Sequence, residues 1–185
     1  HNPEYKIPRW VRYELLASET DGPYSRKGLK FIPDPAVNLP QADDYDYRGS
    51  GWSRGHMAPA GDFKWSSQAM METFYFTNCC PQDQSMNSGQ WHTLEKKVRD
   101  WANRYRKITI YTGPIILENA YGTIGFNKVV IPDAFFKAIL AGEQSIAFVM
   151  YNHNNNENMQ KCTMSVDDLE VLTGIDFFEE LPEYD

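Results

Sequence analysis

The chain has 185 residues, 42% of them apolar, and a formal net charge of −7 at pH 7. This length and composition are typical of one globular domain and exclude a disordered chain, so we expect residues 1–185 to form a single domain. No apolar run approaches the length that a bilayer requires, so we expect no membrane-spanning segment.

The N-terminal part of the chain predicts short elements separated by loops. A strand is expected over residues 10–17, and segments rich in turn-forming residues follow as far as residue 51. A short helix is expected over residues 66–73, with Ser66 or Ser67 as its N-cap, and a buried strand over 74–80.

The strongest helical pattern covers residues 87–105. Its apolar residues recur at spacings of three and four, so one face of the helix is apolar: Trp91, Leu94, Val98, Trp101 and Tyr105. Basic residues are dense between Lys96 and Lys107. They form either a local basic surface, which the net charge alone would hide, or an ordinary solvated helix face.

Strands and helices alternate in the rest of the chain, in the order strand 107–117, strand 127–132, helix 132–142, strand 145–151 and helix 165–174, with a polar turn at 152–158. Pro132 fits the first turn of the first of these helices and Gly142 fits its end, while Gly174 closes the second. The whole pattern predicts a mixed α+β domain.

The stretch GSGWSRGHMAPAGDF, residues 49–63, carries the most chemistry. Its glycines disfavour a helix and permit a ligand to approach the backbone closely. Arg54 lies two residues before His56, so on an extended backbone both side chains point to one face. Arginine offers a planar fork for phosphate oxygens and histidine can act as a general base, so the pair suits phosphodiester cleavage.

Phosphoryl chemistry also calls for a cation, and Mg²⁺ needs few protein ligands because it prefers oxygen and keeps several waters. Asn87 and Glu95, eight residues apart on the predicted helix, would lie about 80° apart around its axis. Asn87 could therefore bind the ion and Glu95 could orient its waters. The alternative is that Asn87 caps the helix and Glu95 pairs with a surface lysine.

The three cysteines, Cys79, Cys80 and Cys162, do not have the spacing of a metal motif. A disulfide from Cys162 to one of the other two stays open. Trp52, Trp65 and Tyr75 could stack on nucleic-acid bases, but core packing is favoured for each. Two other histidines, His92 and His153, are expected to have no catalytic role.

Three segments, in this order, resemble one known family. SRGHMAPAGDF at 53–63, ETFYFTNCCPQ at 72–82 and NSGQWHTLEKKVRDWA at 87–102 resemble the DNA/RNA non-specific endonucleases, which are ββα-metal (His-Me finger) nucleases with secreted bacterial, sugar-non-specific and mitochondrial branches. The likeness extends over nearly the whole chain. It implies an α+β fold in which a central, mainly antiparallel sheet is flanked by helices, with a strand pair that carries the motif and the helix that bears Asn87 packed across it.

The resemblance also implies roles for particular residues. His56 would be the general base that activates the attacking water. Asn87 would be the direct protein ligand of Mg²⁺, with Mn²⁺ as the alternative ion, and Glu95 would hold the waters of that ion. Arg54 would contact the phosphate or stabilise the developing charge.

A second arginine would also bind the phosphate. Arg26 has the spacing to Phe31 and Asp34 that the family shows. Ser53 stands where the family usually has an aspartate, which leaves the base and the metal ligand intact and affects metal preference at most. Gln82 would support the metal site through hydrogen bonds.

The implied activity is the hydrolysis of DNA and RNA with little sequence preference, because contacts to phosphate carry no base information. Products would carry 5′-phosphate ends. The alternatives are a catalytically impaired relative that only binds nucleic acid, and a phosphodiesterase of small nucleotides. The partners would be DNA and RNA and no membrane, a homodimer stays open, and the C-terminal segment favours an exported bacterial protein over a mitochondrial one.

Overall fold

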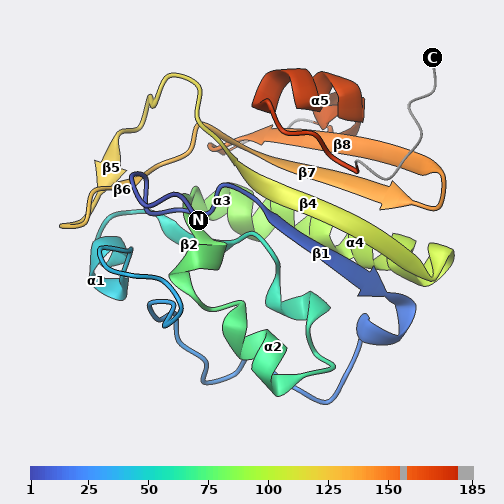
Figure 1. Cartoon of the computed structure of the whole chain (residues 1–185), viewed down its shortest axis with the longest axis horizontal. Coiled ribbons are helices and arrows are strands. Elements are labelled where there is room, and N and C mark those ends of the chain that lie inside the picture. The colour runs from blue at the N-terminus through green and yellow to red at the C-terminus, as the bar shows by residue number, and fades with distance from the viewer. Residues whose placement is uncertain (155–157, 179–185) are drawn as a thin grey trace.

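The computed structural model describes residues 1–154 and 158–178. Its centre is an antiparallel sheet of five strands in the order β1-β4-β7-β8-β9 (Figure 1). The strands are β1 (Val11–Leu16), β4 (Lys107–Ile115), β7 (Ala134–Ala141), β8 (Gln144–Tyr151) and β9 (Thr163–Met164). The expected α+β class with a central antiparallel sheet is confirmed.

Helices cover both faces of this sheet. The long helix α4 (His92–Tyr105) lies behind it in Figure 1 and α5 (Val166–Thr173) lies on the other face. Side chains therefore alternate between two cores along β7. Phe135 and Ile139 pack in the core that includes α4, whereas Phe136 and Ala138 pack in the core under α5.

The expected helix over residues 132–142 is wrong, because this segment forms strand β7. Seven of its eight residues are buried, since both faces of the strand are covered. An apolar run buried on both faces has no alternation, and periodicity alone does not separate it from a buried helix. Gly142 (φ +65°) does not end a helix but lies in the tight turn between β7 and β8.

The helix expected over residues 87–105 is present and begins earlier. It consists of α3 (Gln84–Met86), a π-helical segment (Asn87–Trp91) and α4. Asp83 caps its start, because the Asp83 carboxylate accepts a hydrogen bond from the backbone N–H of Met86. The predicted apolar face is buried at Trp91, Leu94 and Val98, and it becomes exposed toward Tyr105.

The strand expected over residues 74–80 is displaced, because residues 76–78 form a 3₁₀ turn and the strand β3 is Cys79–Gln82. It pairs antiparallel with β2 (Ser53–His56), which is the glycine-rich stretch. The helix that bears Asn87 follows β3 directly. Two strands followed by a helix are the arrangement that the resemblance implies, and Figure 1 shows them beside the main sheet.

Smaller elements complete the molecule. They are α1 (Asp44–Tyr47), α2 (Ser67–Glu72) and the two-stranded pair β5 (Thr123–Ile124) and β6 (Val129–Val130). Ser66 caps α2 and Gly174 closes α5, both as expected, and Ser165 caps the start of α5. Of the polar turn at 152–158, residues 155–157 lie outside the described part of the chain.

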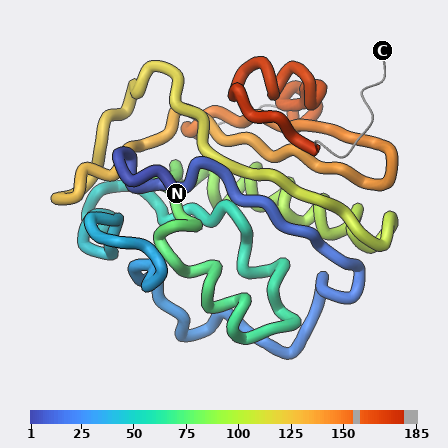
Figure 2. Tube along the Cα trace, in the orientation of Figure 1, coloured from blue at the N-terminus to red at the C-terminus, as the bar shows by residue number. Residues whose placement is uncertain are grey.

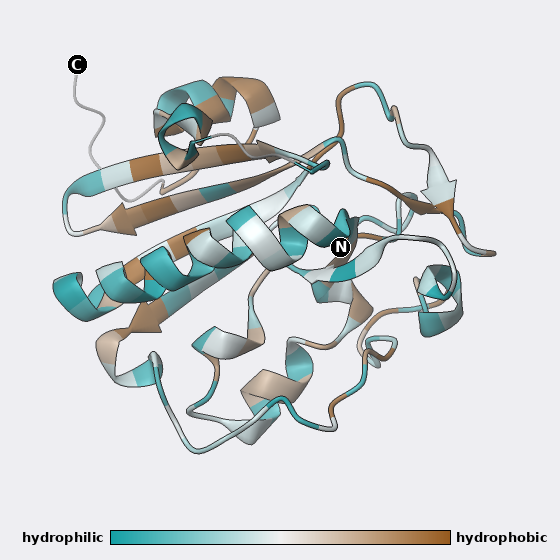
Figure 3. Ribbon diagram, turned by 180° about the vertical axis from the view of Figure 1, so that it is seen from behind, coloured by the Kyte–Doolittle hydropathy of each residue, from teal (hydrophilic) through white to brown (hydrophobic). Residues whose placement is uncertain are grey.

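The long connection between β1 and α1 passes along the lower edge of the molecule (Figure 2). A parallel bridge between Ile32 and Tyr75 fixes this connection against the segment before β3. Figure 3, which shows the molecule from behind, has apolar stretches along the strands and a polar outer surface on α4. Within the described residues, no helix is long and apolar enough to span a membrane.

Candidate active site

Strands β2 and β3 pack closely enough to require glycine at position 55. In their register Gly55 lies opposite Cys80 and Ser53 opposite Gln82. A Cβ at position 55 would overlap Oε1 of Gln82 and lie 2.6 Å from its Cβ. The absence of a side chain at Gly55 therefore makes room for the fully buried Gln82, and this position of the motif is dictated by packing.

His56 ends strand β2 in an aromatic pocket. Its ring lies 4.9 Å from the ring of Phe31 and 4.8 Å from that of Phe74, edge-on to the latter. The residue is 8% exposed, and its Nε2 atom is buried with no hydrogen-bond partner among the described residues. A buried nitrogen without a partner is uncommon and indicates a position prepared for a ligand or water.

Burial, and secondarily the positive charge of Arg26, lowers the pKa of His56 to about 3. Its ring is therefore neutral at physiological pH, with one nitrogen free to accept a proton. A bound anion near the ring would raise this pKa toward the range useful for general base catalysis.

Arg26 and Arg54 approach the site from two different segments. The guanidinium of Arg26 lies 5.2 Å from the centre of the Phe74 ring, which itself contacts His56. Arg54 lies on β2, 5.4 Å from the centre of the Tyr47 ring. The structure thus places Arg26 near the imidazole and exposes it to solvent, whereas Arg54 is held among protein groups.

Arg54 is oriented by a carboxylate that the sequence did not single out. Its Nη2 atom forms an ion pair of 2.7 Å with Asp44 at the start of α1 and also donates a hydrogen bond to the Asp44 carbonyl oxygen. Asp44 pairs with Arg48 as well, and these contacts outweigh burial to lower its pKa. The Nε atom of Arg54 is buried without a partner among the described residues.

Asn87 does not cap the helix, because Asp83 does so four residues earlier. Its side-chain amide accepts and donates no hydrogen bond among the described residues, so its oxygen is available to a ligand. The π-helical segment Asn87–Trp91 adds one residue to a turn. Asn87 and Glu95 therefore correspond to positions seven apart in a regular helix and lie about 20° apart around the axis, closer than the predicted 80°.

Glu95 does not pair with a surface lysine. Its side chain is only 12% exposed and its Oε2 lies 3.3 Å from Nδ1 of His92. Burial raises the pKa of Glu95, and the buried Lys137 is the main influence in the opposite direction. The helix thus presents a largely buried carboxylate two turns after Asn87.

A buried polar network lies next to Glu95. The carboxylate of Asp62 accepts a hydrogen bond of 2.7 Å from the Tyr13 hydroxyl and forms an ion pair of 2.7 Å with Arg99. Asp62 is the last residue of the short turn that follows the His56 motif. This network joins β1, the motif and α4.

The motif therefore runs along the helix that bears Asn87 and Glu95. At one end Ser53 contacts Gln84 through their side chains, and at the other Asp62 binds Arg99. His56 lies between these two anchoring points in the chain. Gln82 donates to the sulfur of Met86, 3.2 Å away, and its Oε1 is buried without a partner among the described residues.

Sequence reasoning missed Asp44, Asp62 and Lys137. The pattern around Asp62 continues directly from the motif, so its adjacency to His56 was the available signal. Asp44 lies in an acidic run with no distinguishing feature, and Lys137 lay within a segment taken for a helix. Neither could be placed before the tertiary structure was known.

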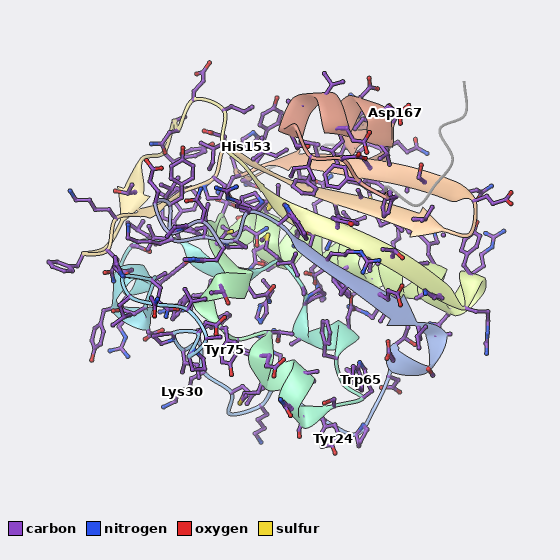
Figure 4. The ribbon with its side chains drawn as sticks, in the orientation of Figure 1. Tyr24, Lys30, Trp65, Tyr75, His153 and Asp167 are labelled. Carbon is purple, nitrogen blue, oxygen red and sulfur yellow. The ribbon has the colours of Figure 1, made fainter. Side chains whose placement is uncertain are left out.

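Among the described residues, the His56 ring contacts the rings of Phe31 and Phe74 and none of the other candidates. Trp52 packs against Tyr121 with the ring centres 5.3 Å apart, while Trp65 is 45% exposed. Trp65 and Tyr75 project from the lower part of the molecule around α2, whereas His153 lies at the opposite end, as Figure 4 shows. His153 stacks on Tyr151.

Cys79, Cys80 and Cys162 are all buried and no disulfide joins them, so the disulfide that the sequence left open is not formed.

The donor set suits an ion that is held largely by water. Among the described residues, no group of three His, Cys, Asp or Glu side chains could hold a metal ion. Asn87 supplies an amide oxygen without a partner and Glu95 a carboxylate on the same side of the helix. Oxygen donors in small number fit Mg²⁺ or Mn²⁺ rather than zinc, which takes nitrogen and sulfur ligands in closed protein sites.

Comparison with known proteins gives consistent results. The sequence profile of the DNA/RNA non-specific endonucleases matches residues 1–184. Human mitochondrial nuclease EXOG is 39% identical and human mitochondrial endonuclease G is 31% identical, over 95% and 96% of this chain. A crystal structure of an EndoG/EndoGI complex superposes with a TM-score of 0.90 and 29% identity, covering 98% of this chain and 82% of that one.

The chain spans about half the length of the curated relatives it matches, for example 53% of human EXOG. The expectation of an exported bacterial protein is wrong, because the relatives are named as mitochondrial nucleases. They come from vertebrates and from fungi, including the mitochondrial nuclease of Saccharomyces cerevisiae at 34% identity. The C-terminal segment that suggested export was therefore a poor guide, and residues 179–185 of it lie outside the described part of the chain.

Proposed function

The chain belongs to the DNA/RNA non-specific endonuclease family, and on that premise we propose that it is a metal-dependent nuclease that hydrolyses phosphodiester bonds of DNA and RNA. The observation that carries the proposal is the buried, partnerless Nε2 atom of a neutral His56 beside the exposed cation Arg26. A proton acceptor next to an anion-binding group is the minimum that hydrolysis of a phosphodiester needs.

In this proposal His56 accepts a proton at Nε2 from the water that attacks phosphorus. The neutral ring is ready for this step, and the phosphate held nearby stabilises the imidazolium that forms. Arg26 binds a phosphate oxygen, and Arg54, kept in place by Asp44, contacts the phosphate from strand β2.

Asn87 would hold a Mg²⁺ or Mn²⁺ ion through its side-chain oxygen, and Glu95 would accept hydrogen bonds from the waters of that ion. The bound ion supplies positive charge for the developing phosphoryl charge and for the leaving oxygen. Ser53 and Gln82 support the site by bracing β2 and β3 against the start of the helix. Loss of the bond to the 3′ oxygen leaves a 5′-phosphate end.

Little sequence preference follows from the kind of groups present. Two arginines, one imidazole and an ion recognise phosphate, and phosphate contacts do not report the base. The reaction also needs no 2′-hydroxyl, so both DNA and RNA are expected substrates. The mitochondrial relatives favour a mitochondrial setting for this activity.

The test is digestion of supercoiled plasmid and of total RNA with Mg²⁺, with Mn²⁺ and with EDTA, for the unmodified protein and for His56→Ala. His153→Ala is the matched control, since His153 is an exposed histidine whose ring stacks on Tyr151 and not on the rings around His56. We expect cleavage of both polymers only in the presence of metal. The cleavage rate should fall by about 10²–10⁴-fold in His56→Ala, which is the usual contribution of a general base. The rate of His153→Ala should be unchanged.

Intact polymers with folded, unmodified protein and either ion would overturn the nuclease proposal in favour of a nucleic-acid-binding relative. Cleavage of small phosphodiesters but of neither polymer would favour the nucleotide phosphodiesterase instead. Mapping the ends of the products with a 5′-phosphate-dependent exonuclease checks the predicted polarity.

A further inference from the structure

A lysine is buried in the middle of the main sheet. Lys137 lies on β7, is 1% exposed, and points to the same side of the strand as Phe135 and Ile139. This side of β7 is otherwise apolar and faces α4. A fully buried lysine is rare unless it is paired, because taking an ammonium group out of water is costly.

The charges around Lys137 are few and come from two elements. Its Nζ atom lies 4.9 Å from the centre of the Trp91 ring, and the charged groups that influence it are Glu95, Asp62 and Arg99. Glu95 and Arg99 belong to α4, and Asp62 belongs to the turn after the motif. No described carboxylate forms a direct ion pair with Lys137. The ammonium group and the carboxylates therefore interact over longer distances, in surroundings of low polarity that screen charge weakly.

The balance of charge assigns Lys137 to Glu95. Asp62 already has a direct partner in Arg99 and a hydrogen bond from Tyr13. Among the described residues, only His92, which lies at the surface, is within hydrogen-bond distance of Glu95. Lys137 is the remaining cation of this buried cluster of two carboxylates and two cations.

We propose that Lys137 is a positioning residue that supplies the counter-charge for Glu95 and so keeps this carboxylate directed toward the metal site. The inference rests on the proposed function in one respect, since the metal site belongs to it. Trp91 belongs to the π-helical segment that also bears Asn87, and its ring contacts the ammonium group of Lys137. Lys137 therefore contacts the helix between Asn87 and Glu95, the two residues of the proposed metal site.

The charge coupling can be measured without any activity. Lys137→Met leaves Glu95 buried without a counter-charge, and we expect the melting temperature to fall by roughly 10 °C. Glu95→Gln removes the charge that Lys137 compensates. The double variant Lys137→Met/Glu95→Gln has neither charge, and about half of the loss caused by Lys137→Met should be recovered.

Metal binding is the second readout. Titration of the protein with Mn²⁺, followed by calorimetry in the absence of nucleic acid, should show affinity about 10-fold weaker in Lys137→Met. Thr112→Val is the matched control, because Thr112 is buried on β4 directly opposite Lys137 and its replacement changes no charge. We expect this control to bind Mn²⁺ as the unmodified protein does.

Additive effects of the two substitutions on the melting temperature would overturn the inference, as would unchanged Mn²⁺ affinity in folded Lys137→Met. If either of these outcomes is found and the unmodified protein still cleaves both polymers, the inference on Lys137 fails while the proposed nuclease function holds. If the two substitutions are strongly coupled but the unmodified protein neither binds Mn²⁺ nor cleaves, Lys137 compensates the charge of Glu95 and the proposed metal site is overturned.

Discussion

The side chain of Gln82 lies directly against the backbone of Gly55 and leaves no room for a Cβ there. The Gln82 side chain fills the volume that a Cβ at position 55 would need, so strands β2 and β3 approach with no room for a larger residue. His56 follows Gly55 directly. The position of the proposed base therefore depends on the missing side chain beside it.

The first prediction follows from this contact. Gly55→Ala should lower the free energy of unfolding by about 1–3 kcal/mol, because the extra methyl group overpacks a closed site. Urea denaturation measures the effect. Gly89→Ala is the control, since a Cβ there meets no atom within 4 Å, and its stability should change by no more than about 1 kcal/mol. Equal losses of stability in the two variants would show that the contact with Gln82 is not the reason why position 55 requires glycine.

The second prediction concerns acid. His56 has a pKa of about 3 in the folded chain and an ordinary one near 6.5 when unfolded. Between these values the unfolded chain binds more protons, so stability falls as the pH falls from about 6.5 toward 3, by at most about 5 kcal/mol.

His56→Gln removes this titration and should lose less stability over the same pH range. Urea denaturation of both proteins at pH 7, 6, 5 and 4 measures the difference in slope. If the free energy of unfolding changes with pH in the same way in both proteins, the low pKa of His56 is contradicted, even if the variant is less stable at every pH.

The third prediction concerns Arg54. Arg54→Lys should lower kcat/KM for nucleic acid by about 10-fold or more, because lysine cannot pair with Asp44 and present a second donor to phosphate at once. Arg48→Lys is the control, since Arg48 also pairs with Asp44 but lies at the surface. Steady-state cleavage of a labelled oligonucleotide distinguishes them, and an equal loss in both would implicate Asp44 rather than Arg54.

The fourth prediction concerns Asn87. Asn87→Ala should weaken Mn²⁺ binding by about 10-fold or more while the melting temperature stays within about 2 °C, because the amide has no hydrogen bond among the described residues. Ser88→Ala is the neighbouring control, and among the described residues it removes only the hydrogen bond from the Ser88 hydroxyl to the Gln84 carbonyl. A large loss of stability in Asn87→Ala with unchanged ion affinity would make Asn87 a structural residue.

The fifth prediction tests the network beside Glu95. Tyr13→Phe removes a hydrogen bond of 2.7 Å to the buried carboxylate of Asp62 and should lower the free energy of unfolding by about 1–3 kcal/mol. Tyr24→Phe, at an exposed tyrosine, should change it by less than about 0.5 kcal/mol. Indistinguishable stabilities of the two variants in urea would remove the network as a source of stability.

Local sequence was sufficient for the features that depend on near neighbours in the chain. The spacing of Trp91, Leu94 and Val98 placed the long helix, because the helical repeat of the backbone brings residues three and four apart to one face. The strand that carries the proposed base was implied by the resemblance of the motif. The ordered motifs then indicated the family, and with it the fold.

Only the tertiary structure decided the features that depend on what covers a segment. Residues 134–141 form a strand because helices bury both of its faces, which erases the alternation that a sequence could show. The π-helical segment aligns Asn87 with Glu95 in a way that apolar spacing did not predict. Asp44, which pairs with Arg54, and Lys137, which influences the pKa of Glu95, were identified only by the fold, because electrostatic interactions act through space rather than along the sequence.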